Sequence, residues 1–356
     1  MFQLSELINK HYKLSNHIYY PSISEYSDAE KRYWNNISVK DQERFLIECR
    51  ENGTLNAVRK LFPNYEDIIF EPTRSVGLKF LNIKSSDIGI DYGCMWGNML
   101  IHCAKKSKFM VGINQTIPSL EFLNQRLYEE KLDNVALINE NLMNPLHFRK
   151  IFDFALINGV LERIPETNQI DLTQHFNTKD NSLIKGKSNP FELQLKFLKQ
   201  VNLNLKKEGT LYLAIENRWD YQHLLWKRDL HSNLFYTAIL PRWISNIISK
   251  IVYGRRYVNY IYSMKALERL LSLAGFSITK KYAAFPDYRF PQQIIDIDYK
   301  DTSDYYPAYR SLAKPTKNII KKAFCKCRHF LNTILYKKLK LLTLAPSFII
   351  IAKNNN

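Results

Sequence analysis

Short apolar runs alternate with helical stretches along most of the chain from about residue 85 onward. Amphipathic segments such as IPSLEFLNQRLYEEK and FELQLKFLKQVNLNL separate six runs: IGIDYG, FMVGIN, NVALIN, FDFALIN, TLYLAIE and FSITKKYAAF. This alternation is typical of a sheet covered by helices on both faces. It predicts a doubly wound, mostly parallel α/β sheet of seven strands, in which PSFIIIAK at residues 346–353 is the last strand.

The chain divides into segments that differ in composition and in the elements they are predicted to form. Residues 1–72 are predicted to be a helical N-terminal segment. The core is expected to comprise residues 73–284 together with 346–356. Within it lies a first insertion, residues 218–262, which is rich in aromatic side chains and arginine. A second insertion, residues 285–345, separates the sixth strand from the last and contains a basic amphipathic helix.

Composition fits a folded chain and not a disordered or membrane-spanning one. Of the 356 residues, 46% are hydrophobic and 24% are charged, close to ordinary globular usage. No apolar run approaches the length that crosses a bilayer. Charged residues occur near the start of the sequence before any apolar run, which is not the pattern of a secretory signal. The five cysteines are scattered, so reduced thiols and a cytoplasmic location are expected. Cys325 and Cys327 form a lone C-x-C, so no metal site is predicted.

The net charge of +17 is uneven along the chain. No acidic residue follows Asp304, whereas eleven basic residues do. Such a region suits an anionic partner, either nucleic acid or a membrane surface, although solubility and a Lys/Asn/Ile-rich genome explain it equally well. Apolar positions between 316 and 335 recur at helical spacing. That stripe can lie on an anionic membrane or pack against its own domain.

The segment most suggestive of chemistry is IGIDYGCMWG, residues 88–97. It reads as a strand, then Asp91, then Gly93 and Gly97 at the opening of a helix. Turns at the carboxyl ends of strands are where open α/β sheets bind ligands, and glycine allows close backbone approach. No G-K-[ST] follows and the G-x-G-x-x-G pattern is incomplete. Taken alone, the segment fits either a ligand-binding turn or a plain connection.

Four further segments make the pattern more specific. They are residues 111–126, 152–164, 191–217 and 263–276, with the phrases V-L-E-x-I, L-K-x-x-G and L-x-x-A-G-F. In order and spacing the set resembles the class I S-adenosylmethionine-dependent methyltransferases. A looser likeness, carried by AIENR, YxxYxYSxxxLxxLLxxAGF and FPDYRFP, is to methyltransferases found with bacterial cell-surface polysaccharide and glycolipid synthesis.

The resemblance implies S-adenosylmethionine as cofactor and assigns residues to it. Asp91, Gly93 and Gly97 would wrap the methionine part, with Asp91 holding the ammonium. The other expected contacts follow the next three strands: ribose at Asn114, adenine at Asn141, and the methyl group and acceptor at Asn158.

The chain departs from the family at several of these places. Met95 replaces the usual middle glycine, Arg163 a common histidine, and Asn114 and Asn141 two acids. An amide still donates and accepts hydrogen bonds, but losing charge-assisted bonds weakens affinity. The alternative is therefore a degenerate, non-catalytic fold that serves as a binding or assembly partner.

Two carboxylates are candidate proton acceptors, because Glu162 and Glu216 follow the fourth and fifth strands. Partial desolvation would raise their pKa values to a useful range. Glu162 fits equally well as a helix-start residue favoured by the helix dipole. His223 and His231 are further possible bases, although a histidine in an aromatic segment is more often packed or at the surface.

Four residues are candidates for binding the acceptor. Asn217 and Arg218 follow the fifth strand, and the arginine fork suits a carboxylate or phosphate. Asp287 and Arg289 lie between two prolines, in a loop that is either a lid over the acceptor or a structured connection.

The expected substrate is a saccharide or lipid-linked saccharide precursor of the cell envelope, methylated at the cytoplasmic side. The basic helix within 315–345 would dock the protein at the inner face of the plasma membrane. An RNA methyltransferase is the other alternative. Nucleic acid is the less favoured partner, because no RNA-binding module signature appears and residues 1–72 are not a basic arm.

Overall fold

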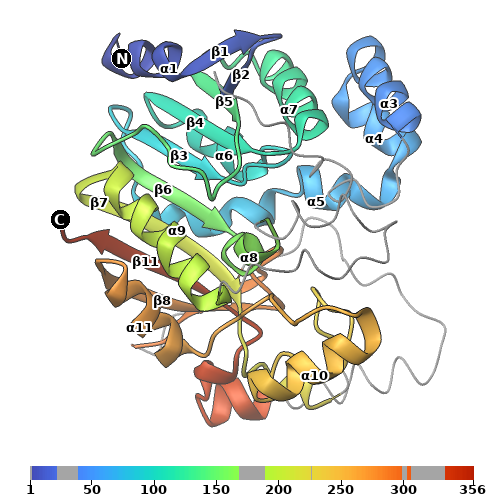
Figure 1. Ribbon diagram of the computed structural model, residues 1–356, viewed down its shortest axis with the longest axis vertical. Coiled ribbons are helices and arrows are strands. Elements are labelled where there is room, and N and C mark those ends of the chain that lie inside the picture. Colours follow the sequence, from blue (N-terminus) through green and yellow to red (C-terminus); the bar gives the residue numbers. More distant parts are fainter. Residues whose placement is uncertain (1, 22–38, 168–188, 226, 299–302, 306–332) are drawn as a thin grey trace.

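In the computed structural model, the described residues are 2–21, 39–167, 189–225, 227–298, 303–305 and 333–356. They form one sheet of eleven strands, in the order β1-β2-β5-β4-β3-β6-β7-β11-β8-β9-β10 (Figure 1). The bounds of the strands are β1 (Tyr12–Ser15), β2 (Ile18–Pro21), β3 (Ile88–Tyr92), β4 (Phe109–Asn114), β5 (Val135–Asn139), β6 (Phe152–Asn158), β7 (Leu205–Glu216), β8 (Phe276–Phe285), β9 (Gln293–Asp296), β10 (Ser303–Tyr305) and β11 (Ser347–Asn354).

The doubly wound α/β fold is confirmed, and the seven expected strands are β3 to β8 and β11. β5, β4, β3, β6 and β7 run parallel, and β11 lies antiparallel between β7 and β8. The predicted strand number is wrong, because two strands are added at each edge. At one edge β1 and β2 join β5, and at the other β9 and β10 join β8. The described sheet is thus mixed and not mostly parallel.

The N-terminal segment contains strands where only helices were predicted. Its helices are α1 (Phe2–His11), α3 (Val39–Asn52), α4 (Thr54–Leu61), the short 3₁₀ helix η1 (Pro63–Tyr65) and α5 (Glu66–Phe70). Residues 12–21 form the β1–β2 hairpin instead, with Asn16 and His17 both at positive φ in its two-residue turn. Four-residue strands carry too few positions for periodicity to reveal them, and pairing with the exposed edge of β5 stabilises them.

Helices cover both faces of the sheet. On one face lie α9 (Pro190–Asn204) and α11 (Met264–Leu273), where Phe197 and Leu267 share a core with Ile90 of β3 (Figure 1). On the other lie α6 (Asn98–Ala104), α7 (Ile117–Glu129) and the 3₁₀ helix η2 (Pro72–Leu81), where Leu100 and Leu123 pack with β4 and β6. Side chains alternate between the two faces along each strand, so the sheet has a core on either side.

The two insertions add short elements around the core. Residues 218–262 contain the 3₁₀ helix η6 (Tyr221–His223) and α10 (Arg242–Tyr253). Residues 285–345 contribute β9, β10, the π-helix η7 (Thr333–Lys338) and the 3₁₀ helix η8 (Leu342–Leu344). Most of the predicted basic helix lies outside the described residues. Within the described ranges, no helix has both the length and the hydropathy that crossing a bilayer demands.

Candidate functional site

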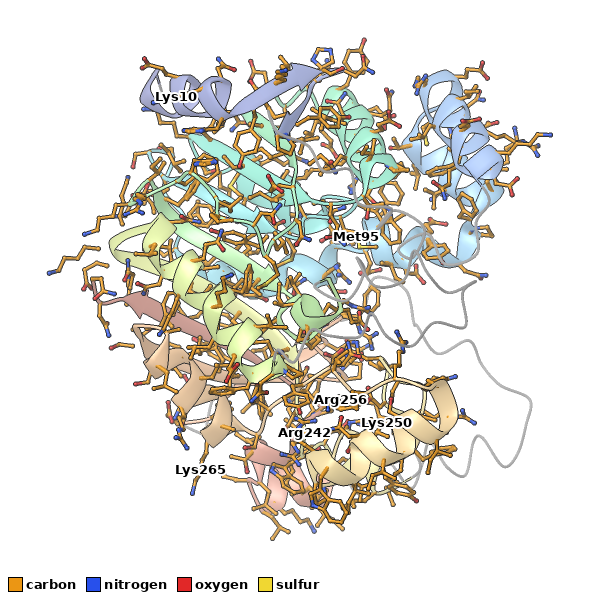
Figure 2. All side chains as sticks on the ribbon, viewed as in Figure 1. Lys10, Met95, Arg242, Lys250, Arg256 and Lys265 are labelled. Carbon is orange, nitrogen blue, oxygen red and sulfur yellow. The ribbon has the colours of Figure 1, made fainter. Side chains whose placement is uncertain are left out.

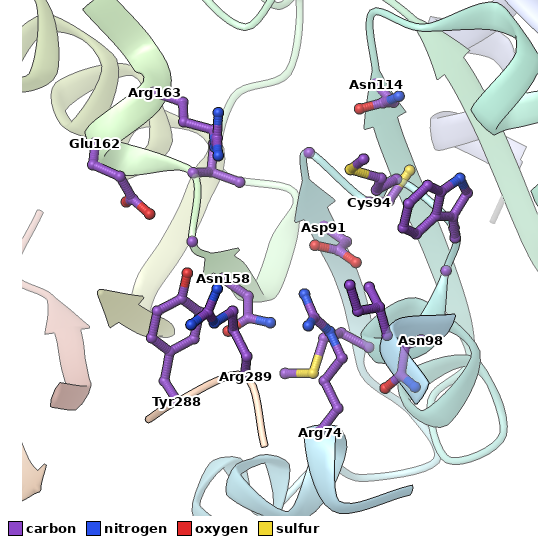
Figure 3. Close-up of a pocket in the computed structure, with 18 of the residues that line it drawn as sticks. Arg74, Asp91, Cys94, Asn98, Asn114, Asn158, Glu162, Arg163, Tyr288 and Arg289 are labelled. Atoms are coloured by element: carbon purple, nitrogen blue, oxygen red, sulfur yellow. The ribbon is translucent and has the colours of Figure 1, made fainter. Parts of the chain in front are cut away.

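A pocket of about 440 Å³ opens at the carboxyl ends of the central parallel strands (Figure 3). It lies where the sheet order reverses, since β4 and β6 flank β3 on opposite sides. This is the position at which open α/β sheets bind ligands, and the volume is typical of small-molecule sites. Eight predicted residues lie in its wall: Asp91, Gly93, Gly97, Asn114, Asn158, Glu162, Glu216 and Arg289.

The turn after β3 forms one end of the pocket. The backbone N–H groups of Gly93 and Cys94 both donate to the carbonyl of Ile113 in β4, at 2.8 and 3.0 Å. Gly93 has φ 77°, and a Cβ there would lie 2.6 Å from Cγ2 of Val160. Only glycine therefore fits this bend without strain.

Met95, at the position where the family usually has glycine, also adopts a left-handed conformation, with φ 46°. Met95 and Trp96 both line the pocket, which keeps a volume of about 440 Å³ in their presence. The Trp96 ring packs edge-on against Tyr65, with ring centroids 5.4 Å apart. The departure at Met95 therefore does not close the pocket.

Asp91 is buried at the floor of the pocket. Burial raises the pKa of its carboxyl group to about 7, and the positive charge of Arg74 opposes a larger rise. Figure 3 shows the Arg74 guanidinium extending toward the Asp91 carboxylate. Arg74 comes from η2, ahead of the first core strand, and its role could not be inferred from any motif in the sequence.

Several polar atoms at this end have no hydrogen-bond partner among the described residues. They are Oδ1 of Asn98 and both side-chain polar atoms of Gln115. A buried polar group without a partner costs about 1–3 kcal/mol, so such groups in a pocket wall suit a polar ligand. Gln115 follows the predicted Asn114, whose own amide donates to the carbonyl of Thr116 at 3.4 Å. These donors and acceptors fit the hydroxyl and amino groups of an adenosyl cofactor.

The other end of the pocket brings Glu162, Glu216 and His231 together from three separate segments. Nε2 of His231 lies 3.5 Å from Oε2 of Glu216, and the Tyr288 hydroxyl donates to Oε1 of Glu216 at 3.4 Å. Glu162 is fully buried, and its carboxyl group lies beside that of Glu216, to which it can donate a hydrogen bond when it is protonated. Figure 3 shows its carboxyl group directed to the side of the pocket that holds Asn158 and Tyr288.

The two carboxyl groups have opposite pKa shifts. Burial raises the pKa of Glu162, and the negative charge of Glu216 raises it further. Burial alone would raise the pKa of Glu216 as well, but the hydrogen bond and charge of His231 lower it instead. Burial disfavours the His231 cation, yet Glu216 raises its pKa to about 9. At neutral pH Glu216 and His231 thus form an ion pair, and Glu162 carries a proton that it can release.

The same three side chains could hold a metal ion, which the sequence did not predict. One ligand atom from each lies within 4.8 Å of the other two. Two carboxylates and an imidazole suit Mn²⁺, Fe²⁺ or Zn²⁺. Without a metal ion, the positive charge of His231 balances the negative charge of Glu216.

Asn217 and Arg218, predicted to orient the acceptor, are not in the pocket. Asn217 is fully buried and donates to the carbonyls of Thr343 and Ala345, at 2.8 and 2.7 Å. Arg218 donates to backbone carbonyls at 238–240. Both side chains hold the insertions against the core, and this corrects the prediction.

Three other predicted residues also lie away from the pocket wall. The Asn141 side chain accepts from the backbone N–H of Met143, at 2.9 Å, and does not reach the pocket. His223 is buried beside the carbonyl of Lys227. Asp287 pairs with Arg289 at 2.8 Å and so holds the arginine in the wall.

Replacing Asn217 with alanine tests its structural assignment. We expect the free energy of unfolding to fall by about 3 kcal/mol, because two buried carbonyls and the backbone N–H of Trp219 lose their partner. Cofactor affinity should stay unchanged. Chemical denaturation and calorimetry measure the two quantities, and Asn56→Ala, at an exposed position of α4, is the control. An unchanged stability with impaired acceptor use would restore the predicted binding role.

The sequence did not reveal Arg74, Asn98 and Gln115 as pocket residues, and it placed Tyr288 only in the loop with Asp287 and Arg289, either a lid or a connection. Gln115 had a signal, because it directly follows a strand end that was already singled out. Asn98 likewise follows Gly97. His231 was named as a possible base, but nothing in the sequence distinguished it from His223.

Comparisons with known proteins found relatives that match part of the chain. No family model matches the chain. It is 31% identical over 85 residues to the probable cobalt-precorrin-6B C(15)-methyltransferase (decarboxylating) of Methanocaldococcus jannaschii, covering 23% of this chain and 46% of that protein. A Methanococcus maripaludis protein of the same name is 30% identical over 103 residues, covering 28% and 57%. These sequence relatives are named as methyltransferases. The chain spans about half the length of the curated relatives it matches.

Two solved structures show a more distant likeness. The phosphoethanolamine N-methyltransferase 2 of Haemonchus contortus in complex with S-adenosyl-L-methionine matches with a TM-score of 0.44 and 12% identity, over 88% of this chain and 60% of that one. The cyclase SpnF matches with a TM-score of 0.43 and 11% identity, over 79% of both chains.

Proposed function

We propose that the protein is an S-adenosylmethionine-dependent methyltransferase that methylates a hydroxyl group. The observation that carries this proposal is the division of one pocket into two ends of different chemistry. One end has the Asp91–Gly97 turn and polar atoms without partners. The other has the buried carboxyl group of Glu162 within 4.8 Å of ligand atoms of Glu216 and His231. The sequence relatives named as methyltransferases support it.

The first end suits the cofactor. Asp91 would bind the ammonium group, and the Gly93 bend brings backbone close to the methionine part. Gln115 and Asn98 would supply the hydrogen bonds for which they have no protein partner. The acids that the family usually has at Asn114 and Asn141 are then not required for every polar contact.

The second end suits deprotonation of the acceptor. When bound, the cofactor supplies an activated methyl group, so the protein has to align the acceptor and remove its proton. Glu162, in its ionised form, would accept the proton of the attacking hydroxyl group. The negative charge of Glu216 next to Glu162 raises the proton affinity of its carboxylate, and the positive charge of His231 opposes part of that rise. Asn158 lies in the wall at the carboxyl end of β6 and would orient the acceptor.

For the acceptor we propose a saccharide or lipid-linked saccharide precursor of the cell envelope, methylated at the cytoplasmic side. Arg289 and Arg163 line the pocket at this end, and a guanidinium suits a phosphate or carboxylate on the substrate. The likeness of AIENR and FPDYRFP to polysaccharide-associated methyltransferases supports this class. We do not propose the cobalt-precorrin-6B of the relatives' name as the acceptor, because the match covers about half of those proteins.

Calorimetric titration with S-adenosylmethionine tests the proposal at its foundation. We expect a dissociation constant in the micromolar range, abolished by Gly93→Arg because any side chain at that position meets Val160. Circular dichroism of the variant checks that it still folds. No heat at millimolar cofactor would favour a non-catalytic binding or assembly partner.

A further inference from the structure

Helix α10 has an unusual distribution of side chains. Trp243, Ile247 and Ile251 lie on one side of it, spaced by four residues, and they are 66%, 49% and 78% exposed. Val252 and Tyr253, at the end of the helix, are exposed as well. We call these five residues the docking face. The apolar side of a surface helix ordinarily packs against the protein's own core. A contiguous group of apolar side chains that is exposed instead is typical of an interaction site.

The opposite side of α10 is small and polar. Ser245 is fully buried and Ser249 is 3% exposed, and the Ser245 hydroxyl donates to the carbonyl of Thr237 at 2.8 Å. The helix thus buries serines and presents tryptophan and isoleucine outward. The exposed apolar residues of α10 therefore do not pack against the core of the protein.

The surroundings of the docking face are basic. Residues 230–267 contain no acidic residue but five lysines and arginines. Lys250 is exposed on α10 itself, and Arg256 is exposed just after it (Figure 2). Further exposed apolar side chains come from the same insertion: Leu224, Leu225, Leu230 and Phe235. Apolar residues including tryptophan, with lysine and arginine beside them, are the pattern of a helix that lies in the interface of an anionic bilayer.

We propose that α10 docks the protein on an anionic lipid surface, with the docking face inserted among the lipids and Lys250, Arg255 and Arg256 at the headgroups. This differs from the predicted attachment through 315–345. The basic segment 310–332 is a poorer occupant of the docking face, because the lysine and arginines beside that face would repel its positive charge. A second copy of the chain would bring the same basic residues together around a symmetric contact.

A hydrogen bond connects the docking face to the end of the pocket that holds Glu162 and His231. The Tyr253 hydroxyl donates to the carbonyl of Ser232 at 2.7 Å, and the adjacent residues Leu230 and His231 line the pocket. A molecule anchored in the bilayer would thus arrive beside Glu162. That part of the inference rests on the proposed function and narrows the acceptor to a lipid-linked saccharide, whereas docking itself does not depend on it.

Co-sedimentation with vesicles tests the docking. The full chain should bind vesicles that contain phosphatidylglycerol and phosphatidylcholine in equal parts, and bind phosphatidylcholine alone much less. The double variant Ile247→Asp/Ile251→Asp should lower the bound fraction about tenfold or more, because two carboxylates would have to enter the apolar layer. Leu273→Asp is the matched control, since Leu273 is 48% exposed on α11 at another surface and should leave binding unchanged.

Further measurements separate the possible outcomes. Cofactor calorimetry on the double variant should give the wild-type affinity, which shows an intact fold and keeps the two proposals distinct. Vesicle binding that survives the double variant, or that is lost only when the lysines of 310–332 are replaced, would overturn the assignment to α10. A wild-type dimer that the double variant converts to monomer in sedimentation velocity, without vesicle binding, would show that a second copy covers the face.

Discussion

Replacing Glu162 with glutamine should lower kcat for methyl transfer by about 10²–10³-fold while leaving the affinity for S-adenosylmethionine unchanged. The amide keeps the shape of the side chain but cannot accept the acceptor's proton, and general-base catalysis contributes about this much. The glutamine amide can still donate to the Glu216 carboxylate, as protonated Glu162 does, so the contact between the two side chains is kept. Formation of S-adenosylhomocysteine with nucleotide-linked and lipid-linked saccharides measures the rate.

The pH profile identifies the proton acceptor further. Glu162 works only when ionised, and burial with the neighbouring Glu216 charge raises its pKa to about 8. The wild-type rate should therefore rise with pH across the neutral range and level off above about pH 8. Glu162→Gln should remove that rise. Glu121→Gln is the control, because burial also raises the pKa of Glu121 but it lies in α7 outside the pocket wall.

Two results would contradict this assignment. Retention of the wild-type rate by Glu162→Gln would leave Glu162 as the helix-start residue that the sequence also allowed. Loss of wild-type activity with a chelator, restored by Mn²⁺ or Zn²⁺, would show that Glu162, Glu216 and His231 act as metal ligands.

Replacing Asp91 with alanine should raise the dissociation constant for S-adenosylmethionine by about 10–100-fold, because a charge-assisted hydrogen bond contributes about 1.5–3 kcal/mol. The pH dependence follows from the pKa of about 7 that burial gives the Asp91 carboxyl group. Only the ionised carboxylate attracts the cofactor's ammonium, so wild-type affinity should weaken as pH falls below about 7. The affinity of Asp91→Asn for S-adenosylmethionine should be low and should not change with pH between pH 6 and pH 8.5.

Calorimetry between pH 6 and pH 8.5 makes the comparison, with the exposed Asp133→Asn as control. If the affinity of Asp91→Ala equalled that of the wild type, Asp91 would have a purely structural role under the pocket. Arg74 would then be its partner, and the cofactor's ammonium group would have to bind elsewhere.

Part of the site could be predicted because parallel strands end at the same edge of a sheet. Asp91, Asn158, Glu162 and Glu216 lie at or just beyond the carboxyl ends of strands that the apolar pattern revealed, and all four line the pocket. The turn was recognisable for a local reason, since Gly93 and Gly97 adopt left-handed backbone conformations that glycine favours. Asn141 failed because its strand lies one position further from the centre, and its side chain binds its own loop.

Residues that follow Glu216 directly in the sequence were predicted to share its pocket, and they do not. Asn217 and Arg218 follow it directly, yet they turn to backbone carbonyls of the two insertions. His231, in contrast, is fifteen residues away and comes within 3.5 Å of Glu216. Such contacts depend on how the insertions pack, which no local pattern encodes.

The sequence by itself determined the central strands, the ligand-binding turn and the edge of the sheet at which chemistry occurs. These follow from the periodicity of apolar residues and the backbone freedom of glycine, which are local properties. The tertiary structure decided which of two histidines reaches Glu216, that Arg74 stands over Asp91, and that α10 turns its isoleucines outward. Each of these outcomes depends on contacts between segments far apart in the chain, where burial and charge act through space and not along the sequence.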